Sequence, residues 1–181
     1  MNLMAQRFVT RAYVLQDKQA VIQITQDAFG PEHKQRSVWN LRKAEPIDSL
    51  TLIAEDKSLL GENENAETQK IVGSLQFWPI KIGSYRSLLL GPLAIKYYLR
   101  GLGAGRLLVT QALSQIKNRD WEFCLVSGEP DYYPKFGFKP VPTNLEWPGP
   151  IERERVQFIN LRSLDLEKLT DISLPVLSDV E

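Results

Sequence analysis

The stretch Arg100-Gly101-Leu102-Gly103-Ala104-Gly105 lies between two apolar patterns of different period. Before it, residues 88–95 form a continuous apolar run, which is typical of a strand buried on both faces. After it, apolar residues recur at helical spacing and predict an amphipathic helix: Leu107, Leu108, Ala112, Leu113 and Ile116. The stretch is therefore predicted to be a glycine-rich turn from a strand into the N-terminus of a helix.

A turn of this kind has the properties of an anion site. The first backbone N–H groups of a helix lack partners within the helix, and the helix dipole adds partial positive charge there. Glycines allow the backbone to approach a bulky phosphate closely. Arg100 and Arg106 can add charge-assisted hydrogen bonds. The turn therefore predicts a ligand that carries phosphate.

Two common nucleotide-binding patterns do not fit this turn. A P-loop requires Gly-Lys-Ser/Thr, whereas Gly105 is followed by Arg106-Leu107. A dinucleotide fingerprint requires G-x-G-x-x-G, but the third glycine is replaced by Arg106 when counted from Gly101 and by Leu108 when counted from Gly103. The pattern that fits is Arg/Gln-x-x-Gly-x-Gly/Ala.

Length and composition favour one ordinary soluble domain. The chain has 181 residues, and its 22 basic and 22 acidic side chains cancel, which gives no general attraction to nucleic acid or to an anionic membrane. Cys124 is the only cysteine and cannot form an internal disulfide, so a reducing compartment is favoured. We find neither a secretory signal nor a membrane span and expect a cytoplasmic protein. One cysteine and one histidine, His33, do not make a zinc site, so we expect no metal.

The order of predicted elements indicates a mixed α/β (α+β) domain around one sheet. Residues 1–165 are expected to form this domain, with 166–181 as an irregular C-terminal tail packed on it or extending from it. Residues 57–70 are expected to form a long exposed hairpin loop. Gly91-Pro92 lies inside the fourth strand and predicts a bulge or splayed edge there, because proline cannot donate to a sheet ladder. The expected strands are 8–15, 50–55, 71–78, 88–95, 121–126 and 156–161, and the expected helices are 17–28, 31–46, 105–116 and 131–136.

Three further motifs make the turn more specific. They are Leu90-Gly-Pro-Leu-Ala-Ile95, Gly128-Glu-Pro-Asp-Tyr-Tyr133 and Phe136-Gly-Phe138. With the turn, they resemble the GNAT superfamily of N-acetyltransferases, and within it a branch of bacterial predicted acetyltransferases with GPLAV- and GxPxYYxxFGF-like motifs. The resemblance extends from about residue 8 to 161 and is strongest over 88–140. It implies a GNAT-like acyl-CoA N-acyltransferase fold, whose central, mostly antiparallel sheet is splayed at the fourth strand and flanked by helices.

The resemblance also implies a site for acetyl-CoA as co-substrate. Leu93, Ala94 and Ile95 match the strand that pairs with the pantetheine arm. The turn matches the pyrophosphate loop, whose members here are Arg100, Gly101, Leu102, Gly103, Ala104, Gly105 and Arg106. Tyr133 matches the general acid that protonates the departing thiolate, whereas Tyr132 is expected to pack. A thiol has a pKa of about 8.5 and a tyrosine about 10, so this proton transfer would be close to thermoneutral.

The acceptor and the general base stay open at this stage. Glu129 and His33 are expected to be solvated, and Cys124 is expected to be a packed core thiol rather than a nucleophile. The resemblance places the acceptor between residues 29–41 and 140–155. Candidate lining or charge-bearing residues are Trp39, Trp78, Trp147, Glu45, Asp48, Glu152 and Glu154.

Three functions remain compatible with the sequence. The leading hypothesis is acetyl transfer to a primary amine of a small molecule. The alternatives are acetyl transfer to a protein or peptide amine, and a non-catalytic acyl-CoA binder with a regulatory role. No nucleic acid or membrane partner is expected, and a homodimer is left open.

Overall fold

The computed structural model describes residues 7–59, 70–142 and 144–179. Its backbone contacts divide the chain into two compact units made of interleaved segments. The first unit comprises Met1–His33, Asp48–Gln76 and Pro92–Gln115, and the second comprises Lys34–Ile47, Phe77–Gly91 and Ile116–Glu181. Most of the expected hairpin loop, including Gly61-Glu-Asn-Glu-Asn65, lies outside the described residues.

The first unit contains β1 (Phe8–Ala12), β2 (Leu52–Asp56) and the first half of β3 (Ile71–Ile82), which pair in antiparallel order. Helix α1 (Lys18–Phe29) follows β1 and ends where Gly30 adopts a φ of 81°. This helix and its glycine stop confirm the prediction from the spacing of apolar residues.

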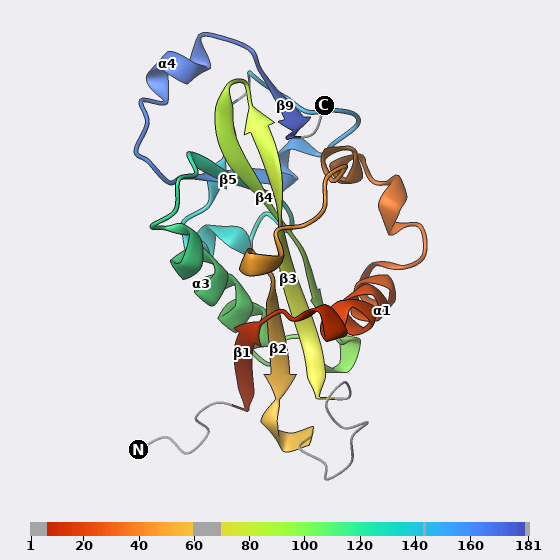
Figure 1. Cartoon of the computed structure of the whole chain (residues 1–181). Helices are drawn as coiled ribbons and strands as arrows, with labels where there is room; N and C mark the ends of the chain where they lie inside the picture. The colour runs from red at the N-terminus through yellow and green to blue at the C-terminus, as the bar shows by residue number, and fades with distance from the viewer. Residues whose placement is uncertain (1–6, 60–69, 143, 180–181) are drawn as a thin grey trace. The chain divides into compact units, whose positions relative to one another are not determined.

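Two helices cover opposite faces of the strands in the first unit (Figure 1). Val21 of α1 packs in a cluster with Ile53 of β2. Gly73 of β3 pairs with Ala54, the next residue of β2, and therefore faces the other way. A Cβ added at Gly73 would lie 3.5 Å from Leu108 in α3 (Ala104–Ile116), so α3 covers that second face. The sheet is thus buried on both sides here.

The second unit contains the first half of β4 (Tyr85–Ile95), which runs parallel to β5 (Phe123–Ser127). Beyond β5, β8 (Val156–Asn160) and β6 (Lys139–Pro140) continue in antiparallel order. The second half of β3 pairs antiparallel with β9 (Leu174–Ser178), which runs parallel to β7 (Leu145–Glu146). The strand order β1-β2-β3-β4-β5-β8-β6 is mixed and mostly antiparallel, which confirms the predicted fold class.

The pairing of β4 with β5 ends at the predicted position. The register runs from Ser87, opposite Phe123, to Leu90, opposite Val126. Gly91 follows with a φ of 116°, and Pro92 has no N–H to donate. The residues after them belong to the first unit. The glycine–proline pair therefore marks the end of this ladder, as the sequence indicated.

The helix expected over residues 31–46 does not form. The segment instead contains two 3₁₀ turns, His33–Gln35 and Ser37–Leu41. Tertiary hydrogen bonds explain the difference, because Ser37 Oγ donates to Pro150 O over 2.6 Å and Asn40 Nδ2 donates to Pro148 O over 2.8 Å. Side chains bonded to a distant loop outweigh the weak helical periodicity of this stretch.

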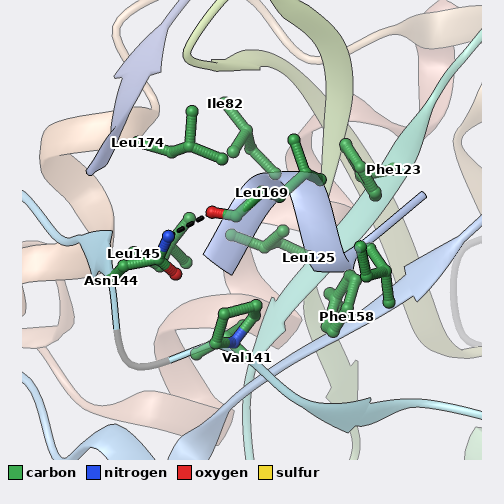
Figure 2. Close-up of a pocket in the computed structure, with 11 residues that line it drawn as sticks. Ile82, Phe123, Leu125, Val141, Asn144, Leu145, Phe158, Leu169 and Leu174 are labelled. Atoms are coloured by element: carbon green, nitrogen blue, oxygen red, sulfur yellow. Dashed lines mark hydrogen bonds between the residues drawn. The ribbon is translucent and has the colours of Figure 1, made fainter. Parts of the chain in front are cut away.

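The C-terminal segment expected to be irregular contains α4 (Glu167–Thr170) and β9. Figure 2 shows an apolar pocket that this segment lines, together with Phe123 and Phe158. Asn144 Nδ2 donates to the carbonyl oxygens of Leu169 and Ile172 and so ties α4 to the preceding loop. Among the described residues, the side chains that line this pocket are apolar except for that of Asn144. The boundary at residue 165 stays a prediction.

Candidate functional site

Two glycines give the turn at 100–105 its conformation. Gly101 has a φ of 80° and Gly103 a φ of 102°, values that side-chain-bearing residues rarely adopt. A Cβ at either position would meet no atom within 4 Å. The requirement for glycine is therefore conformational, and open space lies outside both residues, where a ligand can approach.

The backbone N–H groups at the start of α3 are available to such a ligand. The first hydrogen bond at this end of the helix runs from Leu107 N to Gly103 O over 3.0 Å. The N–H groups of residues 103–106 therefore precede the first possible partner within the helix. Gly103 and Arg106 are exposed, and Leu102 is 53% exposed, whereas Ala104 is buried and packs the helix on the core.

The two arginines of the turn differ in their surroundings. Arg100 Nη2 donates to Ala28 O over 3.0 Å, at the end of α1, and its guanidinium lies 5.4 Å from the Tyr97 ring centroid. Arg100 therefore holds the turn against α1, which the sequence did not predict. Arg106 is exposed at the helix start and has the freer cation.

The end of β4 is held closely against β3 in the first unit. Ala94 and Ile95 are buried and Leu93 is half-buried. A Cβ at Gly73 would lie 2.4 Å from Ile95 Cδ1 and 2.9 Å from Ala94 O, so only glycine allows this approach. The strand and the turn that follows it are thus brought together in one unit, and their binding role stays a prediction.

Tyr133 is buried in the second unit at the start of a 3₁₀ turn, Tyr133–Phe136. The turn ends at Gly137, whose φ is 91°. Tyr133 is 7% exposed, and its ring packs edge-on against Tyr132, with centroids 5.1 Å apart, and against Phe138, with centroids 5.5 Å apart. These aromatic contacts fix the ring in one position.

Gly128 makes the room that the Tyr133 ring occupies. A Cβ at Gly128 would lie 2.1 Å from Tyr133 Cε2 and 2.8 Å from Cδ2, which no real contact allows. The sequence marked Gly128 as part of a motif but assigned it no role. Its spacing five residues before Tyr133 was the available signal, but it could not reveal the contact between them.

Burial controls the ionisation of Tyr133. Loss of solvent raises the pKa of its phenol, and the neighbouring Tyr132 and Cys124 raise it further, while Arg42 and Arg155 act in the opposite direction. The phenol is therefore protonated at neutral pH. Burial likewise raises the pKa of the Cys124 thiol, and this fully buried side chain confirms the prediction of a core thiol.

The other titratable candidates provide no clear base. His33 is 6% exposed and its Nδ1 lies 2.6 Å from Gly30 O, so the expectation of a solvated histidine is wrong. Its 3₁₀ turn places the ring inward where the expected helix would have exposed it. Glu129 is exposed and pairs with Arg155 over 2.9 Å. No group of three or more metal-ligating side chains occurs in the part of the chain that the structure describes.

The acceptor-side candidates separate into exposed acids and buried or half-buried aromatics. The acids are all exposed: Glu45, Asp48, Glu152 and Glu154. Trp39 and Trp78 pack edge-on with centroids 6.0 Å apart, and Trp147 Nε1 donates to Ser37 Oγ over 3.0 Å. Arg42 lies over Trp39 at 4.5 Å, a feature that sequence reasoning missed because Arg42 belongs to no motif.

No helix among the described residues is both long and apolar enough to span a bilayer.

No family model matches the sequence, and no curated protein is similar enough in sequence to count as a relative.

Solved structures do resemble this chain. A GNAT family N-acetyltransferase from Escherichia coli in complex with CoA has a TM-score of 0.70 at 21% identity, with 96% of this chain and 91% of that chain covered. A GNAT family acetyltransferase from Brucella melitensis in complex with acetyl-CoA has a TM-score of 0.61 at 24% identity, with coverage of 84% and 87%. A GNAT family acetyltransferase from Staphylococcus aureus Mu50 has a TM-score of 0.52 at 15% identity, with coverage of 86% and 99%. The chain therefore has the fold of GNAT N-acetyltransferases, as the motifs indicated.

Proposed function

We propose that this chain, which has the GNAT fold, transfers an acetyl group from acetyl-CoA to a primary amine of a small molecule. The observation that carries the proposal is the exposed turn at 100–105, where left-handed glycines precede the first N–H groups of α3, which have no partner within the helix. Two solved structures with this fold hold CoA or acetyl-CoA, which supports the same ligand here.

The turn fits a pyrophosphate by its own chemistry. Backbone N–H groups of Gly103, Ala104, Gly105 and Arg106 donate to phosphate oxygens, and the helix dipole favours their negative charge. Gly101 and Leu102 shape the approach to them, and Arg106 adds a charge-assisted bond. Residues 93–95, held by Gly73, offer backbone groups to the pantetheine arm.

Tyr133 acts as the general acid in this proposal. When the acceptor nitrogen bonds to the acetyl carbon, the carbon–sulfur bond breaks and the sulfur leaves as a thiolate. The Tyr133 phenol donates its proton to that sulfur. The attacking amine must already be neutral, because an ammonium has no lone pair, and the group that removes its proton stays unassigned.

The burial of Tyr133 changes the energetics expected from sequence. Its raised pKa makes the phenol a weaker acid than free tyrosine, so proton transfer to a thiolate is less favourable than thermoneutral. The same shift ensures that the phenol carries its proton throughout the neutral and mildly alkaline range. Tyr133 would therefore stay protonated over this pH range, and the rate of its proton transfer to the thiolate would depend on the position of the phenol.

An assay of thiol release with acetyl-CoA and a panel of amines tests this function, with mass spectrometry to identify the acetylated product. Tyr133→Phe should lower kcat without weakening acetyl-CoA binding, and Tyr132→Phe serves as the matched control in the same aromatic cluster. Tight acetyl-CoA binding without turnover of any small amine or peptide would favour the regulatory binder. Turnover of peptide amines alone would favour the protein acetyltransferase. A cytoplasmic location belongs to this proposal and is testable by fractionation.

A further inference from the structure

We infer that Arg42 and Trp78 form an anion-binding subsite for the acceptor, so that the acetylated amine carries a carboxylate. This inference rests on the proposed acetyl transfer and adds the chemical class of its acceptor. Arg42 would bind and orient the acceptor without taking part in the proton transfer. Three observations within the second unit support it.

The first observation is the aromatic support of the Arg42 cation. Its guanidinium carbon lies 4.5 Å from the Trp39 ring centroid and 5.9 Å from that of Trp78. The two indole rings pack edge-on, with an interplanar angle of 70°. Stacking on aromatic faces holds a guanidinium flat and leaves its N–H groups directed outward in the ring plane.

The second observation is that two buried donors in this cluster lack acceptors. Arg42 Nε and Trp78 Nε1 are shielded from solvent, and neither has a hydrogen-bond partner among the described residues. Buried N–H groups normally find a partner. The Arg42 side chain as a whole is half-buried, and Nε is the part of its guanidinium that is shielded and unpaired. Burial lowers the pKa of the Arg42 guanidinium to about 9, which still leaves it charged at neutral pH. An anionic oxygen ligand would satisfy this cluster.

The third observation is the charge around the cluster. Lys34 Nζ lies 5.9 Å from the Trp39 ring centroid, so a second cation approaches the same indole. Arg42 and Tyr133 influence each other's ionisation, which relates the cluster to the proposed general acid. Lys34 is exposed, as are Glu45 and Glu152, the acids first considered as amine-binding groups, whereas Arg42 is half-buried. The partly buried charge in this region is therefore positive and favours an anionic ligand.

Arg86 provides an internal comparison. It also stacks on a tryptophan, with its guanidinium carbon 4.9 Å from the Trp121 ring centroid. Its side chain is 56% exposed, however, and pairs with Asp120 over 3.7 Å. Arg86 thus has both water and a counter-ion, whereas Arg42 Nε is shielded from solvent and has no hydrogen-bond partner among the residues that the structure describes. Both arginines stack on a tryptophan, but Arg86 is already paired with Asp120, so Arg86→Met is a matched control for Arg42→Met.

Steady-state kinetics on paired acceptors test the inference. The pairs are glycine, leucine and glutamate with their α-carboxamides, which keep the amine and remove the α-carboxylate charge. Arg42→Met should raise KM for the amino acids about 10- to 100-fold, as expected when a charged hydrogen-bonding partner is lost. The KM values for the carboxamides and for acetyl-CoA should stay within about twofold, since neither ligand places a carboxylate on Arg42. Arg86→Met should behave as wild type, and Arg42→Lys should recover part of the affinity.

A binding titration separates this inference from the proposed function. Tryptophan fluorescence is followed during addition of N-acetylglycine, N-acetylleucine or N-acetylglutamate, which requires no turnover. Saturable changes in wild type and Arg86→Met, but not in Arg42→Met, support the subsite. If these changes occur but no amine is acetylated, the subsite stands and only the proposed catalytic function is refuted. Acetylation of neutral amines with no preference for carboxylates would overturn the subsite and leave acetyl transfer intact. Loss of acetyl-CoA binding in Arg42→Met would also overturn the subsite, because Arg42 would then bind an anionic group of acetyl-CoA and not the carboxylate of the acceptor. If Arg42→Met does not fold, Trp78→Phe removes one donor alone and should raise the same amino-acid KM values.

Discussion

Gly128→Ala should displace the Tyr133 ring and lower kcat while leaving the phenol group itself in place on the side chain. The new Cβ would lie 2.1 Å from Tyr133 Cε2, whereas carbon atoms in favourable contact are about 3.5 Å apart, so the ring must withdraw by roughly 1.4 Å. Tyr132 and Phe138 already pack against the ring and oppose that movement. A displacement of about 1 Å at a reacting group can cost on the order of 100-fold in rate. We therefore expect kcat to fall about 100-fold, with a stability loss of roughly 1 to 3 kcal/mol from overpacking.

The assay is thiol release at saturating acetyl-CoA, combined with a double-mutant cycle. Gly128→Ala is measured in wild type and in Tyr133→Phe, and circular dichroism and thermal unfolding confirm that each variant is folded. If Gly128 acts only by positioning the phenol, its substitution should change kcat little once the hydroxyl is absent. Wild-type kcat in Gly128→Ala, or equal losses of kcat in both backgrounds, would refute the positioning role. Acetyl-CoA affinity should be unchanged, because Gly128 is not among the residues proposed to bind acetyl-CoA.

Three further predictions concern separate parts of the molecule. Tyr133→Phe should lower kcat about 100-fold, and because burial raises the pKa of this phenol, wild-type kcat should show no loss up to pH 10; a decline below pH 9 in wild type but not in the variant would contradict this. Gly103→Ala should weaken acetyl-CoA binding about 10-fold by calorimetry, since its φ of 102° strains any side-chain-bearing residue; an unchanged Kd would exclude a role in binding. Asp56 is held by Arg7 over 2.7 Å, and this bond lowers the pKa of its carboxyl to about 2. Its stabilisation is therefore present above about pH 4 and lost as the pH falls towards 2, so Asp56→Asn should cost roughly 1 to 2 kcal/mol in urea unfolding at pH 7 and almost nothing at pH 2. Equal costs at both pH values would show that the ion pair is not the cause.

Local patterns were sufficient for the elements whose own residues determine them. Helix α1 follows apolar spacing and stops at a left-handed Gly30, and the β4–β5 ladder stops next to Gly91-Pro92. These features depend on backbone conformation and periodicity, which are properties of neighbouring residues. The turn at 100–105 belongs to the same class, because its left-handed glycines are visible as glycines in the sequence.

Features that depend on distant residues were not predictable in this way. The helix expected over 31–46 gives way to 3₁₀ turns, because Ser37 and Asn40 bond to carbonyls more than 100 residues away. The tail forms β9 because β3 offers it an edge to pair with. Neither interaction leaves a mark in the local pattern of the segment that it changes.

The sequence by itself determined the class of fold and the position of the glycine-rich turn for which we propose phosphate binding, because both follow from periodicity and from glycines at a helix start. It also singled out Tyr133 by its place in a motif. Only the tertiary structure decided the environment of that residue: Gly128 accommodates its ring, and burial raises the pKa of its phenol. The tertiary structure likewise brought Arg42 onto Trp39 and left its Nε without an acceptor in the described part of the chain. Desolvation and the contacts between distant residues arise only when the chain folds, and they control the chemistry of this protein's candidate site.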